Sequence, residues 1–423
     1  MKVLVIGSGA REHAIVTSLI ADDGVTDVVA APGNAGIAQI ATTVPVDVGD
    51  PDAVAELAAS VAADLVVIGP EVPLVAGAAD AVRERGIACF GPSAAAARLE
   101  GSKAFAKEVM AEAGVPTAMA HVCTTVDEVA AALDQFGAPY VVKDDGLAAG
   151  KGVVVTSDRD QALAHARACF THDNDAQVVV EEFLDGPEVS LFAVTDGTTV
   201  IPLQPAQDFK RVGEGDTGPN TGGMGAYSPL PWAPEDLVEK VTQRVLQPVV
   251  DAMARRGTPF TGLLYAGLAM TSRGVRVVEF NARFGDPETQ VVLANLRTPL
   301  GQLLMAAATG HLDQVPPLAW QSGYAVTVVV AAEGYPASPR TGDVISGLER
   351  AAEEANVDIF HAGTTISDTG EIASSGGRVL SVTAHGETLA RAREHAYAGV
   401  DLIRLEGSHH RRDIAAAAAE AQG

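Results

Sequence analysis

Short apolar strands that end in Gly or Pro alternate with helical stretches through the first hundred residues, and this alternation constrains the fold most. We expect strands at 2–7, 25–31, 65–69 and 87–91, with a helical stretch from Arg11. Apolar β-branched runs separated by helices predict a parallel, doubly wound sheet. Ligands bind in the crevice at the carboxyl ends of such strands, so we expect this edge to carry a site.

The rest of the chain predicts two further α+β units. Ser102 opens a helix that Gly114 ends, and a looser group of strands with one helix follows through residue 200. Residues 204–231 are rich in Gly, Pro, Asp and Thr, so we expect a long functional loop there. Beyond this loop we expect a helix at 234–256, a strand hairpin at 263–280, helical structure at 287–309, and a last unit from 323 with strands at 324–332 and 378–384 and a helix at 388–399.

Charge and cysteine content narrow the function classes. A net charge of −25 excludes a broad surface for nucleic acid or anionic membranes. Positive and negative side chains balance only in residues 201–300, which points to anionic substrates there unless the charge pattern is a general acidic drift. The three cysteines lack the spacing of a disulfide framework or zinc site. No apolar run approaches the roughly 18 residues of a membrane span, so we expect a cytoplasmic protein.

The first strand leads into a near miss of the dinucleotide-binding fingerprint. Gly7 and Gly9 are present, but Glu12 replaces the third glycine, and no acidic residue ends the second strand, where Asn34 follows a Pro-Gly pair. This pattern disfavours a nicotinamide cofactor. The N–H groups at the helix start, with Arg11, still suit a phosphate, and the alternative is a tight turn only.

Lysine is rare in this chain, and four of its seven lysines lie in segments with the composition of site loops: Lys103, Lys143, Lys151 and Lys210. An ammonium group is a natural partner for nucleotide phosphates. Lys143 ends an apolar strand, so we expect it to point inward and to need an anion. The alternative is a structural salt bridge with Asp144 or Asp145.

Two neighbouring segments suit a nucleotide. The loop with Gly146, Gly150 and Gly152 is built from small residues and can fold over phosphates with its N–H groups. It is not a Walker A loop, because no Ser or Thr follows its Gly-Lys pair. The strand end formed by Glu181, Glu182, Phe183 and Leu184 can hold an adenine edge through its backbone, and Glu188 can take the ribose hydroxyls. The alternative is an acidic, solvated strand end.

The segment 277–288 carries the sharpest chemical signal. Glu279 and Asn281 alternate with apolar neighbours, so they share one strand face. Two oxygen ligands at this spacing suit a Mg²⁺–phosphate site. Arg283 continues the face and can clamp a phosphate or carboxylate. An exposed polar strand face is disfavoured, because the flanking residues are apolar.

With these segments, the chain resembles the ATP-grasp enzymes, and among them the phosphoribosylamine–glycine ligases, also called glycinamide ribonucleotide synthetases. The run at 216–227, Asp-Thr-Gly-Pro-Asn-Thr-Gly-Gly-Met-Gly-Ala-Tyr, is highly specific. The matching segments cover nearly the whole chain in order: 7–13, 31–34, 69–73, 99–105, 145–153, 181–186, 207–213, 216–229, 265–267, 279–290, 361–363 and 376–379.

The resemblance implies three domains and one reaction. The domains are a Rossmann-like domain at 1–101, an ATP-grasp domain at 102–320 with a mobile lid at 117–187, and a C-terminal domain at 321–423. ATP, glycine and 5-phosphoribosylamine give glycinamide ribonucleotide, ADP and phosphate through glycyl phosphate, with Mg²⁺ or Mn²⁺. We expect a monomer or weak dimer. The alternatives are another ATP-grasp carboxylate–amine ligase and a nucleotide-binding regulator without turnover.

The resemblance also implies roles for single residues. ATP contacts fall on Lys103, Lys143, Gly146, Gly150, Lys151, Gly152, Glu181, Glu182, Phe183, Leu184 and Glu188, and metal contacts on Glu279 and Asn281. The groups near the reacting atoms are Asp208, Lys210, Arg283 and Asp286; our interpretation places the glycine ammonium on Asp208 and its carboxylate on Arg283. Substrate contacts fall on Gly9, Arg11, Asn34, Glu71, Asn220, Thr221 and Gly222.

Three positions depart from the family pattern. Asp144 replaces a small residue, Phe209 a common His, and Ala282 a usual Cys. Strand alternation predicts that Asp144 points away from Lys143. Phe209 disfavours a role in proton transfer for position 209, and Ala282 excludes an essential thiol at position 282.

Overall fold

Five parallel strands form the N-terminal sheet in the computed structural model, which describes residues 1–147, 152–172 and 176–422. Their order is β3-β2-β1-β4-β5, and central β1 and β4 are apolar and almost entirely buried, as expected for a parallel sheet covered on both faces. The prediction of a doubly wound sheet is confirmed. The elements are β1 Lys2–Gly7, α1 Ala10–Ile20, β2 Asp27–Pro32, α2 Ile37–Ile40, β3 Thr42–Thr43, α3 Pro51–Ser60, β4 Leu65–Ile68, α4 Glu71–Ala76, α5 Ala78–Glu84, β5 Ala88–Phe90 and α6 Ala94–Gly101.

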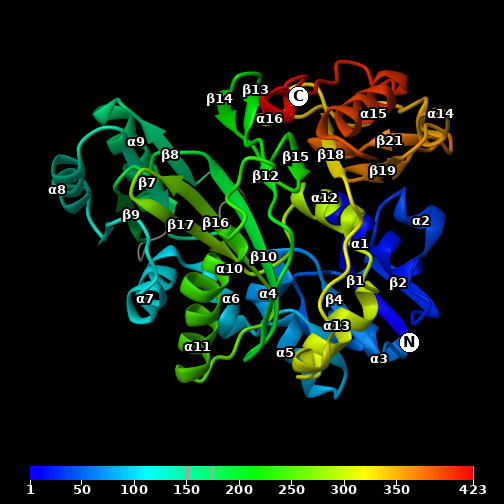
Figure 1. Ribbon diagram of the computed structural model, residues 1–423, viewed down its shortest axis with the longest axis horizontal. Helices are drawn as coiled ribbons and strands as arrows, with labels where there is room; N and C mark the ends of the chain where they lie inside the picture. Colours follow the sequence, from blue (N-terminus) through cyan, green and yellow to red (C-terminus); the bar gives the residue numbers. More distant parts are fainter. Residues whose placement is uncertain (148–151, 173–175, 423) are drawn as a thin grey trace.

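A small four-stranded antiparallel sheet, which we call the lid sheet, lies at the far end of the molecule from β2 (Figure 1). Its strand order is β6-β9-β7-β8, and its apolar core is separate from the larger clusters of the molecule. The helix before it has the predicted ends, since Ser102 caps its N-terminus and Gly114 closes it with a positive φ of 66°. The elements are α7 Lys103–Ala113, β6 Ala120–Cys123, α8 Val126–Phe136, β7 Tyr140–Asp144, β8 Val153–Thr156, α9 Arg159–His172 and β9 Val178–Glu181.

A second four-stranded sheet, β11-β10-β16-β17, runs through the middle of the molecule (Figure 1). The predicted hairpin is present as β16 and β17. The predicted helix at 234–256 is present with a π-turn in its middle, and the helical stretch at 287–309 is split at 296–299, where Pro299 disfavours helix for the residue before it. The elements are β10 Glu188–Asp196, β11 Val200–Pro202, α10 Leu237–Val241, the π-turn Thr242–Leu246, α11 Gln247–Arg255, β16 Thr261–Thr271, β17 Gly274–Asn281, α12 Glu288–Asn295, α13 Leu300–Ala308 and the 3₁₀ turn Leu312–Gln314.

The segment 204–231, predicted as one loop, instead contains four short strands. Two of them, β12 and β15, extend the C-terminal sheet, whose order is β12-β15-β18-β22-β19. Gly225 pairs with Val328 in this sheet, and a Cβ at Gly225 would lie 2.7 Å from the Thr327 carbonyl oxygen. The glycines that suggest a loop therefore allow close strand packing. The elements are β12 Gln207–Asp208, β13 Arg211–Gly213, β14 Thr217–Asn220, β15 Gly225–Ser228, β18 Tyr324–Ala331, α14 Leu348–Ala352, β19 Val357–His361, β20 Thr364–Ile366, β21 Ile372–Ser374, β22 Arg378–Gly386, α15 Leu389–Leu402 and α16 Ala416–Gln422.

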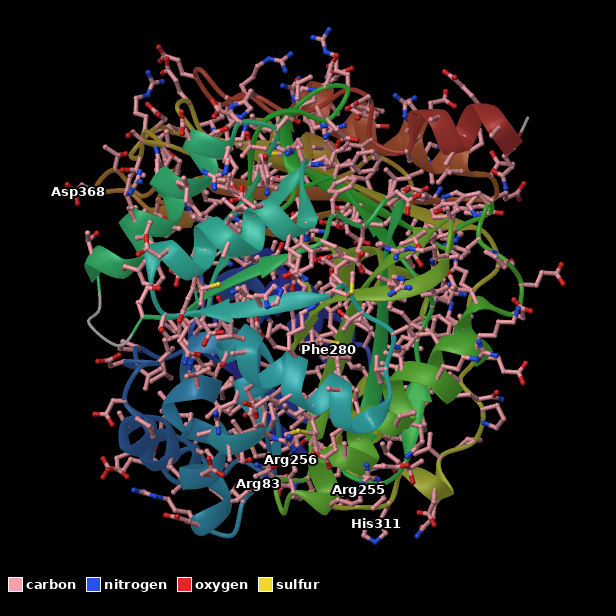
Figure 2. The ribbon with its side chains drawn as sticks, turned by 90° about the vertical axis from the view of Figure 1, so that its left-hand side faces the viewer. Arg83, Arg255, Arg256, Phe280, His311 and Asp368 are labelled. Atoms are coloured by element: carbon pink, nitrogen blue, oxygen red, sulfur yellow. The ribbon has the colours of Figure 1, made fainter. Side chains whose placement is uncertain are left out.

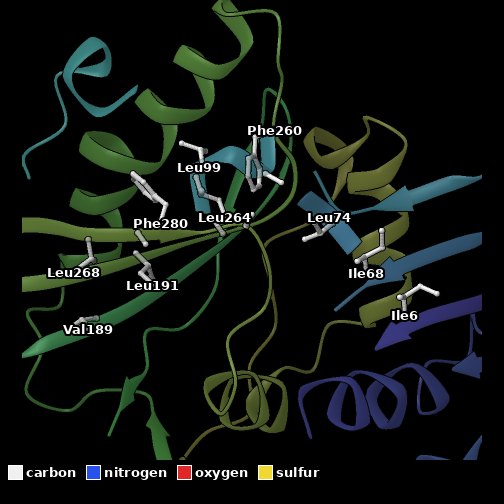
Figure 3. Packing of buried hydrophobic residues seen from close by; sticks show 14 of the residues in the cluster. Ile6, Ile68, Leu74, Leu99, Val189, Leu191, Phe260, Leu264, Leu268 and Phe280 are labelled. Carbon is white, nitrogen blue, oxygen red and sulfur yellow. The ribbon is translucent and has the colours of Figure 1, made fainter. Parts of the chain in front are cut away.

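One apolar cluster joins the N-terminal sheet to the middle sheet. Figure 3 shows Ile6 and Ile68 of the first sheet on one side of this cluster and Leu191 and Leu268 of the second on the other. Phe280 of β17, which is labelled in Figure 2, belongs to this cluster and is buried. Burial of this surface holds the two sheets together. Within the described ranges, no helix has the length and apolar character needed to span a bilayer.

Two buried histidines join the first unit of the chain to the last. The His361 backbone N–H donates to Nδ1 of His13 at 2.9 Å, and Phe360 packs edge-on against the His13 ring. Burial, and then the neighbouring His361, lowers the pKa of His13 to about 3. Burial lowers the pKa of His361 to about 4. Both rings are therefore neutral in the folded protein at neutral pH.

We expect acid to weaken this junction. Below pH about 6.5 the unfolded chain binds protons that the folded histidines do not, so each histidine costs about 1.4 kcal/mol of stability between pH 7.5 and 5.5. The substitution His13→Asn keeps an acceptor for the His361 N–H but cannot titrate. Urea unfolding at the two pH values should show that the wild type loses about 1.4 kcal/mol more than this variant. Equal losses would contradict the assignment.

Candidate active site

Glu279 and Asn281 lie near the end of β17 with neighbours that differ on the two strand faces. Phe280 between them is buried, while Glu279 and Asn281 are partly exposed. A β-bulge leaves Val278 without a partner opposite Leu268 and Gly267. Among the described residues, neither the Glu279 nor the Asn281 side chain has a hydrogen bond or ion pair. Two free oxygen donors on a rigid strand are therefore available to a ligand.

Three charged side chains beside this strand form a buried ion triple. Glu181 on β9 accepts Lys143 Nζ of β7 on one carboxylate oxygen at 2.8 Å and Lys107 Nζ of α7 on the other at 2.9 Å. The bulge turns the Val278 carbonyl oxygen toward Lys143 Nζ at 3.2 Å. Lys143 is thus paired with Glu181, and the alternative of a salt bridge to Asp144 or Asp145 is wrong. The alternation of β7 explains this, because Asp144 points to the other face.

Glu181 and Lys143 of the ion triple stay charged at neutral pH, whereas burial lowers the pKa of Lys107 even though Glu181 opposes this shift. Burial would raise the pKa of Glu181, but Lys143 and Lys107 hold it below its usual value. Burial would lower the pKa of Lys143, but Glu181 and then Glu279 raise it. The site therefore contains an ammonium, Lys143, that is charged at neutral pH and lies beside the free side chain of Glu279.

Lys103 approaches the same place from the start of α7. Its Nζ donates to the Gly146 carbonyl oxygen at 3.1 Å, and Asp145 caps the helix at the Ala104 N–H at 2.7 Å. Burial lowers the pKa of Lys103, and Glu279 opposes this shift. Gly152, at the other end of the glycine-rich loop, accepts the Asp144 N–H at 2.7 Å. The predicted contacts Gly150 and Lys151 lie outside the described residues.

The strand end at 181–184 leaves backbone groups available. The Glu182 N–H donates to the Met119 carbonyl oxygen at 3.0 Å, and its carboxylate pairs with Arg273 at 3.0 Å. Phe183 is 45% exposed. In the part of the chain that the structure describes, no hydrogen bond engages the backbone of Phe183 or Leu184. A planar base can therefore pair with this edge.

Glu188, Lys210 and Asp208 form a second charged group. Lys210 Nζ contacts Glu188 at 2.7 Å and Asp208 at 3.0 Å. Lys210, more than any other neighbour, lowers the pKa of Glu188. Burial raises the pKa of Asp208 even though Lys210 opposes the shift, and the nearby carboxylates Glu288 and Glu188 add to it. A single ammonium is shared among several acids here, so this charged group can accept another cation.

Sequence reasoning missed Glu288, although it lies inside the matching segment 279–290. Its side chain is 3% exposed, and it accepts the Tyr265 hydroxyl at 2.6 Å. Ser190 reaches the same hydroxyl at 2.7 Å. Burial, followed by the charge of Glu288, raises the pKa of Tyr265 well above its usual value. A carboxylate in the first turn of a helix after Gly-Asp-Pro was the available signal.

Arg283 is held by two carboxylates. Its Nε contacts Glu71 at 3.2 Å and its Nη2 contacts Glu100 at 3.0 Å, while Nη1 donates to the Phe284 carbonyl oxygen. Burial raises the pKa of Glu100 despite Arg283, whereas Arg283 and then Arg11 lower the pKa of Glu71 against the effect of burial. Nothing in the local sequence around Glu100 pointed to this pairing.

The fingerprint-like loop after β1 is filled by its own glutamate. Glu12 is 1% exposed and accepts the Gly9 N–H at 2.6 Å and Arg11 Nε at 2.5 Å. A Cβ at Gly69, after β4, would lie 1.9 Å from a Glu12 carboxylate oxygen, so only glycine fits there. A carboxylate therefore occupies the crevice in which a dinucleotide phosphate would lie.

Asn34 and Asp286 tie the first unit to the others. The Asn34 amide donates to the Ser8 and His361 carbonyl oxygens at 2.9 and 2.7 Å. Asp286 accepts the Arg11 N–H at 3.4 Å and Gln290 Nε2 at 3.0 Å. Burial opposes the shift, but Arg378 and Arg11 lower the pKa of Asp286.

The segment 220–222 packs against the C-terminal sheet. The Thr221 N–H and hydroxyl both donate to the Lys210 carbonyl oxygen, at 2.7 and 2.8 Å. The Gly222 carbonyl oxygen accepts Arg378 Nη1 at 2.6 Å. Asn220 lies in β14, opposite Arg211. This run thus connects Lys210 to the junction around Asp286.

The predicted residues therefore form two neighbouring groups. Lys103, Lys143, Glu279, Glu188, Lys210 and Asp208 act on one another electrostatically. Gly9, Arg11, Asn34, Gly222 and Asp286 gather where the first and last units meet. Throughout the ranges that the structure describes, no three His, Cys, Asp or Glu side chains form a metal-binding cluster. A cation at Glu279 and Asn281 would need further oxygen atoms from its ligand.

Comparison with known proteins gives one family. Family models described as phosphoribosylglycinamide synthetase match as the N domain at residues 1–100, the ATP-grasp domain at 101–289 and the C domain at 325–417. The chain is 67% identical over 423 residues to phosphoribosylamine–glycine ligase of Streptomyces coelicolor, covering 100% of both. It is 59% identical over 425 residues to that of Mycobacterium tuberculosis H37Rv, covering 99% of both.

Solved structures agree with this result. The crystal structure of phosphoribosylamine–glycine ligase from Thermotoga maritima has a TM-score of 0.84 and 33% identity, covering 98% of this chain and 100% of that one. A biotin carboxylase–ATP complex from Campylobacter jejuni has a TM-score of 0.73 at 14% identity, covering 96% and 92%, and shows a shared fold only.

Removing the central charge of the ion triple should destabilise the protein. Glu181→Gln leaves two buried ammonium groups without their anion, so urea unfolding should show a loss of about 3–5 kcal/mol. Glu182→Gln is the matched control, because its partner Arg273 is half exposed, and it should cost less than about 1 kcal/mol.

The double variant Lys107→Met with Glu181→Gln should recover part of this loss, because one unpaired buried charge is gone. Equal losses of stability for Glu181→Gln and its control Glu182→Gln would show that Glu181 does not hold the lysines.

Proposed function

The chain belongs to the phosphoribosylglycinamide synthetase family, and we propose that the residues around Glu279 and Lys143 carry out the reaction of that family. This reaction is an ATP-dependent carbon–nitrogen ligation in purine biosynthesis, which joins glycine to 5-phosphoribosylamine. The free carboxylate and amide oxygens of Glu279 and Asn281 beside a buried, charged Lys143 carry the proposal.

The chemistry requires an activated carboxylate. Glycine cannot acylate an amine directly, because its carboxylate has no suitable leaving group. Transfer of the γ-phosphoryl group of ATP to a glycine oxygen gives glycyl phosphate. The amine of phosphoribosylamine then attacks the carbonyl carbon and phosphate leaves. The protein contributes alignment and neutralisation of charge.

ATP would lie between the lid sheet and the middle sheet. Lys103 and Lys143 would contact its phosphates, and Glu188 would take the ribose hydroxyls. The backbone of Phe183 and Leu184 would pair with the adenine edge, beside Glu182. The loop at 146–152 would close over the phosphates. The separate apolar core of the lid supports movement of the lid at 117–187 as one body.

Glu279 and Asn281 fit a divalent metal. They offer hard oxygen donors, they have no partner among the described residues, and they leave the remaining coordination positions to phosphate oxygens and water. We propose Mg²⁺ or Mn²⁺. The bound metal would neutralise charge on the transferring phosphoryl group.

Asp208 is proposed to hold the glycine ammonium, because it is a buried acid with a second carboxylate, Glu288, nearby. Lys210 would lie close to the carboxyl group of the bound glycine. Arg283 was predicted to bind the glycine carboxylate, but Glu71 and Glu100 already balance its charge. We therefore propose that Arg283 holds these two acids in position at the reacting end of the site.

The first unit is proposed to contribute to the phosphoribosylamine site through its loop at Gly9 and the junction at Asp286. Asn220, Thr221 and Gly222 would face it from the other side. We propose domain bounds at 101/102 and 320/321, a cytoplasmic location, and a monomer or weak dimer.

The decisive test of the function is ADP release from ATP with Mg²⁺, with glycine and freshly formed phosphoribosylamine added separately and together. We expect rapid release only with both substrates, together with a product mass equal to that of glycinamide ribonucleotide. Nucleotide binding without stimulation by the pair would favour a different carboxylate–amine ligase on the same fold.

Glu279→Ala should abolish turnover and leave the fold intact, because it removes a metal oxygen from a partly exposed strand position. The assay is ADP release at saturating Mg²⁺, with thermal unfolding as the fold check. Glu349→Ala, at an exposed helix position in the C-terminal unit, should retain full activity. Near-normal turnover of the Glu279 variant would refute the metal assignment.

A further inference from the structure

Three units of the chain meet at Asp286 and Arg378. The α1 N-terminus reaches Asp286 through the Arg11 N–H, at 3.4 Å. Arg378, the first residue of β22, donates from Nη1 to the Asp286 carbonyl oxygen at 2.7 Å and to the Gly222 carbonyl oxygen at 2.6 Å. The junction thus contains the start of α1 from the first unit, the segment at Asp286 from the middle of the chain, and the start of β22 from the last unit.

The anion-binding groups predicted on the first unit are already in use. The Gly9 N–H is bound to Glu12, and the Arg11 guanidinium donates to Glu12 and to the Phe284 carbonyl oxygen at 3.0 Å. The Asn34 amide is bound to two carbonyl oxygens. Glu12 and Asp286 also place two negative charges at the α1 N-terminus, which disfavours a phosphate there.

Arg378 differs from these groups because one edge of its guanidinium is free. Within the described ranges, its Nε and Nη2 have no hydrogen-bond partner, and its side chain is 23% exposed. Gly222 lies over the guanidinium, and a Cβ there would be 3.0 Å from Cζ. The Nη1 contacts to carbonyl oxygens fix the plane of the group. The carboxylate of Asp286 approaches at 3.5 Å on the Nη1 side only.

Two glycines next to Arg378 add donors. Gly376 and Gly377 precede it, both are partly exposed, and no other part of the described chain accepts their N–H groups. Gly377 also packs against the Tyr335 ring, where a Cβ would lie 2.3 Å from the ring. A fixed fork of two N–H groups beside free backbone N–H groups is a geometry that suits a phosphate monoester.

We propose that Arg378, with the N–H groups of Gly376 and Gly377, binds the 5-phosphate of phosphoribosylamine and makes the enzyme specific for the phosphorylated amine. This inference rests on the proposed function and adds the phosphate subsite to it. A phosphate monoester carries a charge of about −1.5 to −2 at pH 7, so a chain with a net charge of −25 needs a local cation to hold it. The bidentate fork of arginine suits this group better than a lysine ammonium.

The test compares Arg378→Gln and Arg378→Lys with the wild type. The matched control is Arg391→Gln, an exposed arginine on α15. Steady-state assays give KM for ATP, glycine and phosphoribosylamine, and competition assays give the inhibition constant of ribose 5-phosphate against phosphoribosylamine. We expect KM for phosphoribosylamine and that inhibition constant to rise at least tenfold in Arg378→Gln and less in Arg378→Lys. KM for ATP and glycine should stay within twofold.

The same assays separate this role from a structural one. If Arg378 only holds Gly222 and Asp286 in place, all three KM values change together or kcat alone falls, and the inference is overturned. Unchanged values for phosphoribosylamine overturn it as well. If Arg378→Gln fails to fold, Arg378→Lys decides, since it keeps the charge but loses the fork. The proposed function fails separately, because it fails only if the wild type makes no product.

Discussion

A carboxylate buried between two lysines is the interaction on which the proposed nucleotide site depends. Glu181 joins β9 of the lid sheet to β7 through Lys143 and to α7 through Lys107. Burying these charges costs desolvation, so each is tolerable only while the others remain. The result is an ammonium that stays charged and fixed in position beside Glu279. A strongly acidic chain thereby keeps a reliable cation where nucleotide phosphates are expected.

A second buried carboxylate shapes the other side of the site. Glu12 fills the crevice at the end of β1 and β4, where dinucleotide-binding folds place a phosphate. The familiar loop is present, but its donors are satisfied internally. The first unit therefore supports the junction around Asp286, and our proposal places the nucleotide between the lid sheet and the middle sheet.

Local signals in the sequence predicted much of the fold. The β-branched runs predicted the parallel sheet, and Ser102 and Gly114 predicted the ends of α7. The alternation around Glu279 and Asn281 predicted their shared strand, which the structure contains, while their metal-binding role stays a prediction. The prediction of a single loop at 204–231 was wrong, because pairing of β15 with β18 overrides the glycine-rich composition of this segment.

Partners distant in the sequence could not be predicted. Glu181 lies 38 positions from its partner Lys143, and Glu288 lies 23 positions from Tyr265. The two partners of Arg283 are farther away, Glu71 by 212 positions and Glu100 by 183. No periodicity connects any of these pairs. Outside 204–231, the sequence by itself determined many of the strands, helices and caps, because those depend on neighbours within a few residues. Only the tertiary structure decided which charges meet, because burial forces each to find a partner wherever the packed elements bring one.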